Sequence, residues 1–133
     1  MPVTIRWFDD TKSIVFWEFE GHWTLEELHT IYNESHDMCL TVPDRKVIAL
    51  VDMTRSANTI PSSIFSTLTA RKRAQAPNFD MVVIISDSTL IKVFIGIMDK
   101  MPVLHEHFQM VLSVEDGLAF IKRRRHEREG GPE

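Results

Sequence analysis

The stretch that decides the fold class is Val47-Ile48-Ala49-Leu50-Val51-Asp52, a continuous apolar run that ends in a carboxylate. A strand that is apolar on both faces must be covered on both faces, which is typical of a central strand in a parallel sheet. A second run of this kind covers residues 81–85. Because parallel strands need a crossover connection, usually a helix, the two runs predict an α/β domain.

The residues before this stretch predict an antiparallel hairpin. Val3, Ile5 and Trp7 alternate with polar residues, as in a half-buried strand. The segment 14–20 is rich in β-branched and aromatic residues, and a turn over residues 9–12 joins it to the first strand. The second strand begins apolar on both faces, so we expect it to be covered on both sides or to pair with a partner.

Helix signals separate the remaining strands. Thr24 and Glu27 have the spacing of a capping box, Pro61 suits a first helical turn, and Pro102 ends a third helix. We expect helices over residues 24–39, 61–74, 89–101 and 113–125, and a last strand over residues 108–112. The predicted order is ββαβαβαβα, with a five-stranded, mainly parallel sheet in one domain over residues 1–126 and a disordered tail over residues 127–133.

Composition excludes several classes of protein. A chain of 133 residues fits one domain, and its net charge of −4 argues against general nucleic-acid binding. No signal peptide is visible, and no apolar run reaches the roughly 18–20 residues that span a bilayer. The single cysteine, Cys39, suits a reducing compartment, so we expect a cytoplasmic protein.

The carboxyl ends of the strands form the first candidate site, because open α/β sheets bind ligands there. The polar residues expected at this mouth are Asp52, Thr54, Arg55, Ser86, Asp87 and Ser88. Ordinary helix capping is the alternative explanation for them. The sequence has no nucleophile or phosphate-binding glycine motif, and its histidines lack metal-ligand spacing. We therefore expect no catalytic residue, metal or cofactor.

The third predicted helix is unusually apolar. Its apolar side chains cover an arc of roughly 200°, whereas one sheet needs little more than about 100°. The excess must meet either a neighbouring helix of the same domain or a partner surface. The second explanation predicts a homodimer or partner interface that contains Ile91, Ile95 and Met98.

The predicted order of elements resembles the STAS domain of bacterial anti-sigma-factor antagonists. The passage Glu18-Phe19-Glu20-Gly21-His22-Trp23-Thr24-Leu25-Glu26-Glu27-Leu28 is similar to the strand, glycine and helix passage of uncharacterised bacterial STAS/SEC14-like proteins. In the antagonists, Asp-Leu-Ser follows a central strand, and Asp-Ser-Ser-Gly opens a helix and holds the phosphorylated serine. Here 51–54 resembles the first part and 61–64 the second, with proline and isoleucine in place of the aspartate and glycine.

This resemblance implies a non-enzymatic regulatory domain that binds a protein, such as a kinase-like partner. It makes Ser62 and Ser63 candidate phosphoacceptors. The alternative is a module of SEC14-like type that binds a small ligand, an anion or a lipid.

Overall fold

The computed structural model describes residues 2–57 and 59–130, with side chains to residue 127. Its five strands form one sheet in the order β1-β2-β3-β4-β5, and only the β1–β2 pair is antiparallel. The strands are β1 (Val3–Trp7), β2 (Ile14–Gly21), β3 (Val47–Ser56), β4 (Phe79–Ile85) and β5 (Phe108–Val111). The helices are α1 (Leu25–Leu40), α2 (Ile64–Arg73), α3 (Thr89–Asp99) and α4 (Val114–Gly130). The predicted α/β class, element order and mainly parallel sheet are therefore confirmed.

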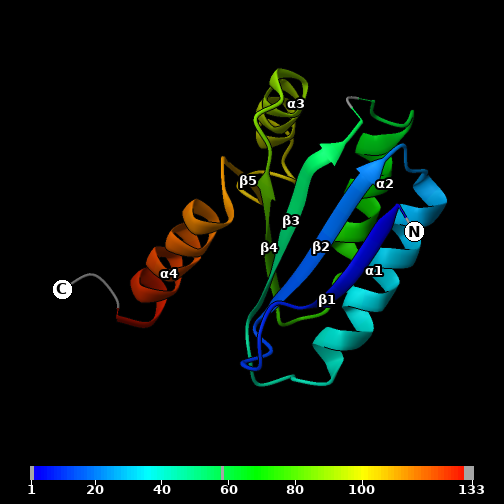
Figure 1. Cartoon of the computed structure of the whole chain (residues 1–133). Coiled ribbons are helices and arrows are strands. Elements are labelled where there is room, and N and C mark those ends of the chain that lie inside the picture. The colour runs from blue at the N-terminus through cyan, green and yellow to red at the C-terminus, as the bar shows by residue number, and fades with distance from the viewer. Residues whose placement is uncertain (1, 58, 131–133) are drawn as a thin grey trace.

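Helices cover the sheet unequally. α1 and α2 lie on one side and α4 on the other (Figure 1). Because side chains alternate along a strand, Val15 and Trp17 of β2 enter the core on the side of α1 and α2, whereas Ile14 and Phe16 enter the core beneath α4. Met98 of α3 joins the first of these cores. Coverage of β2 on both sides agrees with its apolar start.

α4 lies close to β3 because its first turns contain Gly117. A Cβ atom at this position would lie 2.9 Å from Leu50 Cδ1, so only glycine permits this approach without a shift. Further along α4, Arg124 donates two hydrogen bonds to Asp80 of β4, at 2.9 and 3.0 Å. These contacts fix the orientation of α4 on the sheet.

Three boundaries differ from the sequence prediction by at least three residues. β3 continues to Ser56, beyond the apolar run that ends at Asp52, because residues 52, 55 and 56 still pair with β2. α2 begins at Ile64, so Pro61 lies in the preceding loop rather than in the first helical turn. α4 continues to Gly130, so the disordered tail expected from residue 127 is helical through 130. Residues 131–133 of that tail lie outside the described residues.

Candidate functional site: an apolar cavity

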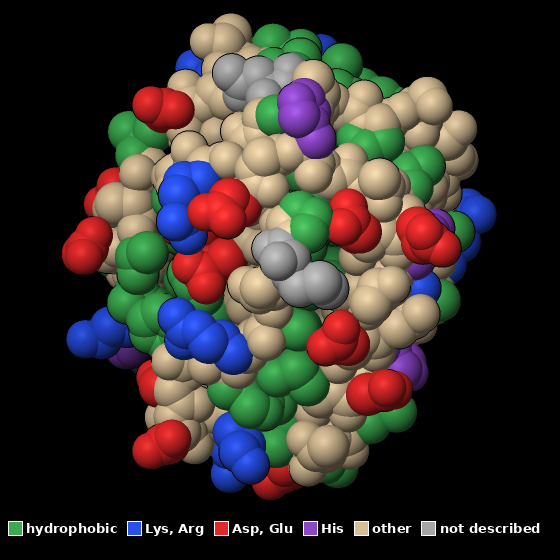
Figure 2. Space-filling view, turned by 45° about the vertical axis from the view of Figure 1, so that its right-hand side comes forward, with side chains coloured by type: hydrophobic (Ala, Val, Ile, Leu, Met, Phe, Trp, Pro, Cys, Tyr) green, Lys and Arg blue, Asp and Glu red, His purple; other side chains and the backbone are tan. Residues whose placement is uncertain are grey.

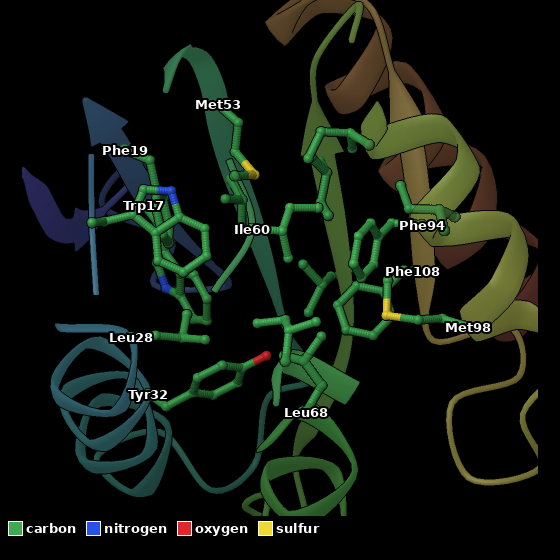
Figure 3. Close-up of a pocket in the computed structure, with 17 residues that line it drawn as sticks. Trp17, Phe19, Leu28, Tyr32, Met53, Ile60, Leu68, Phe94, Met98 and Phe108 are labelled. Carbon is green, nitrogen blue, oxygen red and sulfur yellow. The ribbon is translucent and has the colours of Figure 1, made fainter. Parts of the chain in front are cut away.

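A cavity with a volume of about 80 Å³ lies between the sheet and the helices α1, α2 and α3. Figure 3 shows its walls, with Tyr32 and Leu28 from α1, Leu68 from α2, and Phe94 and Met98 from α3. The sheet contributes side chains from β2 to β5. The complete lining is Trp17, Phe19, Trp23, Leu28, Tyr32, Val51, Met53, Ile60, Ile64, Leu68, Val82, Ile84, Ile91, Phe94, Ile95, Met98 and Phe108.

Strand alternation explains why the cavity is apolar although polar residues lie beside it. Val51 and Met53 of β3 line the cavity, while Asp52 between them does not. Asp52 instead accepts hydrogen bonds from the backbone N–H of Thr54 at 2.9 Å and from its hydroxyl at 2.7 Å. The cavity and the predicted polar mouth therefore use alternate residues of the same strand.

Three lining residues carry a polar atom, and none of these residues is charged. Trp23 Nε1 donates to Ser56 Oγ at 3.0 Å. Trp17 Nε1 is buried and has no hydrogen-bond partner among the described residues. Burial raises the pKa of the Tyr32 hydroxyl, although the positive charge of Arg71 opposes this shift, so the hydroxyl is neutral. Every other lining side chain is aliphatic, a thioether or a phenyl ring.

A second, smaller cavity of about 20 Å³ lies between α1 and α2. Tyr32 belongs to the walls of both cavities, but the smaller one also has polar walls, including Ser35, Arg71 and Gln75. Its Cys39 is fully buried, and burial raises the pKa of this thiol to about 11. A thiol with such a pKa stays protonated and unreactive at neutral pH.

The polar residues expected at the strand ends serve as local caps and ion pairs. Arg55 forms ion pairs with Glu20 at 3.1 Å and Glu18 at 3.8 Å. Ser86 Oγ accepts the backbone N–H of Ser88, whose own side chain caps α3 by accepting from the N–H of Ile91. Asp87 is exposed. None of the six residues lines the cavity, and a ligand site at these strand ends stays a prediction.

The predicted interface residues of α3 point inward. Ile91, Ile95 and Met98 all line the cavity, and Met98 is only 4% exposed. The wide apolar arc of α3 is therefore partly used within the domain, and a partner interface through these three residues stays a prediction. The apolar side chains that α3 exposes are Leu90, Val93 and Ile97.

The two candidate phosphoacceptors lie just before α2. Ser62 and Ser63 are both exposed. Ser63 is the N-cap residue, with a φ of 65°, and its side chain makes no capping hydrogen bond. This is a left-handed conformation that residues other than glycine adopt uncommonly.

The described part of the chain offers little support for other site types. Within it, no three His, Cys, Asp or Glu side chains come together in a way that could hold a metal ion. None of its helices combines the length and apolarity needed to cross a bilayer. On the face in Figure 2, charged side chains of both signs are interspersed with hydrophobic ones, without a continuous basic patch.

A solved structure decides the classification of this fold. An uncharacterized protein of the DUF3478 family from Shewanella loihica PV-4, described as having a SpoIIAA-like fold, superposes with a TM-score of 0.64. The alignment covers 89% of this chain and 92% of that chain, at 15% sequence identity. The chain has a SpoIIAA-like fold. No model of a protein family matches the sequence, and a search of curated proteins found no relative.

The SpoIIAA-like fold agrees with the resemblance to STAS domains seen in the sequence, and at this identity the likeness concerns the fold alone. The cavity was not predicted from the sequence. Its signal was the excess apolar arc of α3 together with Trp17, Phe19 and Trp23. Only the packed structure shows that these two sets face each other.

Proposed function

We propose that this protein is a non-enzymatic binding domain that takes up a small apolar molecule in the cavity beneath α1, α2 and α3. The observation that carries the proposal is the cavity of about 80 Å³, whose seventeen lining residues include no charged side chain. Protein interiors are packed as densely as organic crystals, so an apolar space of this size is an exception that can admit a ligand.

The side chains that line the cavity can change shape to fit a bound ligand. Met53 and Met98 line it, and the unbranched methionine side chain adjusts its shape at little cost. Phe94 is stacked on Phe65 of α2, with ring centroids 4.7 Å apart, so one wall joins α2 to α3. Ligand uptake therefore needs side-chain adjustment more than a change of fold.

A titration with benzene, followed by nuclear magnetic resonance of the indole N–H groups, tests this proposal. The chain has three tryptophans, of which Trp17 and Trp23 line the cavity and Trp7 does not. We expect saturable shifts of the Trp17 and Trp23 signals while the Trp7 signal stays in place. Equal shifts of all three signals, or none, would contradict the proposal.

The exposed serines before α2 favour a second function, phosphorylation-controlled binding of a regulatory protein. Ser62 and Ser63 are accessible, and the first turn of α2 contains no acidic residue. A phosphate there would meet the positive end of the helix dipole. The resemblance to anti-sigma-factor antagonists supports this second proposal through the position of these serines.

A further inference from the structure

We infer that the ligand of the cavity is a neutral molecule without hydrogen-bonding groups, no larger inside the cavity than a single six-membered ring. This inference rests on the proposed function and specifies the chemical class of the ligand. It follows from the chemistry of the walls and from the volume they enclose.

The walls offer a polar ligand very little. The indole N–H of Trp23 already donates to Ser56, and the Tyr32 hydroxyl exposes almost no surface to the cavity. No Asp, Glu, Lys, Arg or His among the described residues lines it. The Trp17 nitrogen is covered by neighbouring atoms, so a ligand oxygen cannot reach it without a shift of the wall. A ligand hydroxyl would therefore lose its hydrogen bonds to water without replacement, and a carboxylate would lose far more.

The volume limits the size of the ligand. Apolar cavities of about 150 Å³ stay dry and bind benzene or xenon. At about 80 Å³, this cavity has room for a single ring only if flexible walls such as Met53 and Met98 yield slightly. Larger rigid molecules would require α2 and α3 to separate at the Phe65–Phe94 stack.

Calorimetric titration of the intact protein with benzene, phenol and benzoate tests the inference. The three probes share a ring and differ in one polar group. We expect benzene to bind, phenol to bind at least about tenfold more weakly, and benzoate to give no measurable heat of binding. Phenol binding as tight as benzene binding would overturn the inference, because it would give the hydroxyl a partner such as Trp17 or Tyr32. Absence of benzene binding would instead contradict the proposed function.

Two matched variants of α3 locate the binding site. Ile95→Phe adds bulk to a residue of the cavity wall and should abolish benzene binding. Ile97→Phe makes the same change at a side chain that is 46% exposed and outside the cavity, and should leave binding unchanged. Ile91→Phe is the second filling variant if Ile95→Phe does not melt as a folded protein. Unchanged benzene binding in a folded filling variant would overturn the inference.

Discussion

Trp17 of β2 and Tyr32 of α1 meet almost at a right angle, with ring centroids 4.9 Å apart and ring planes inclined by 78°. The guanidinium carbon of Arg71 in α2 lies 5.0 Å from the centre of the same Tyr32 ring. One side chain of α1 therefore contacts both the sheet and α2 at the wall of the cavity. This arrangement makes the Tyr32 ring important for stability, while its hydroxyl contributes little.

Two substitutions of Tyr32 separate the ring from the hydroxyl. No hydrogen bond joins the hydroxyl to any described residue, so Tyr32→Phe should change the free energy of unfolding by less than about 0.5 kcal/mol. Tyr32→Ala removes the ring contacts and should cost about 3 kcal/mol. Urea unfolding measures both values. A loss in Tyr32→Phe as large as that in Tyr32→Ala would show that the hydroxyl has a partner.

The pH dependence of stability should report on His107. This side chain is 4% exposed, and burial, assisted by Lys72 and Arg124 against the opposing charge of Asp80, lowers its pKa to about 4. In the unfolded chain His107 takes up a proton near pH 6.5, whereas in the folded protein it takes up a proton only near pH 4. Stability should therefore fall as the pH drops from about 6.5 to 4, by up to about 3 kcal/mol. His107→Gln should reduce this slope in urea unfolding measured at several pH values.

His105 provides a control of opposite sign. The backbone carbonyl of Asp99 accepts a hydrogen bond from the His105 ring, which raises the pKa of His105. The negative charges of the Asp99 and Glu106 carboxylates raise it further. Its contribution to stability is therefore present below pH 6.5 and is lost as the pH rises through the higher folded pKa. His105→Gln should leave the acid slope in place. An acid slope that vanishes in His105→Gln and persists in His107→Gln would reverse the assignment.

Lysine substitutions along α3 test whether its inner or outer face meets a partner. Ile95 lines the cavity, so Ile95→Lys should place a charge among apolar walls and lower the melting temperature strongly. Ile97 is exposed, so Ile97→Lys should melt like the unmodified protein. Size-exclusion chromatography with thermal melting distinguishes the cases. A stable, monomeric Ile95→Lys variant of a dimeric protein would support the predicted interface through Ile91, Ile95 and Met98.

The phosphorylation proposal predicts a change in binding without a change in stability. Ser62 is exposed before α2, so Ser62→Asp should leave the melting temperature within about 2 °C of that of the unmodified protein. The added charge should nevertheless abolish binding to a verified protein partner. Ser62→Asn, an uncharged side chain of the same size as aspartate, controls for the substitution itself. Partner binding that survives Ser62→Asp would contradict the switch.

The sequence was sufficient for the fold because its strands and helices carry local signals. The apolar runs 47–51 and 81–85 became central strands, and the Thr24–Glu27 capping box opens α1 as expected. The boundaries that were wrong depend on tertiary context. The residues after Asp52 stay in β3 because they pair with β2, and no local sequence signal indicates that pairing. Pro61 suits a helix start, but α2 begins only at Ile64, after Ser63 adopts a left-handed φ of 65°.

The cavity could not be predicted, because it depends on how far apart packed elements stay. Asp52 and Thr54 are polar residues at the predicted strand end, whereas Val51 belongs to the apolar run and Met53 lies beyond it, where the sequence predicts no strand. Likewise, the arc of α3 showed that excess apolar surface needed a partner, but not that Ile91 and Ile95 would face Trp17 across a space. Patterns fix which face a side chain occupies, and packing alone decides whether that face is filled.

A crystal structure of the protein under xenon pressure tests the central claim most directly. Xenon is apolar, makes no hydrogen bonds and enters dry cavities of this kind. We predict an anomalous xenon peak between Phe94, Leu68 and Trp17, and its loss in Ile95→Phe crystals treated in the same way. Ordered water in place of xenon, or walls that close the space completely, would contradict the assignment of this cavity as an apolar binding site.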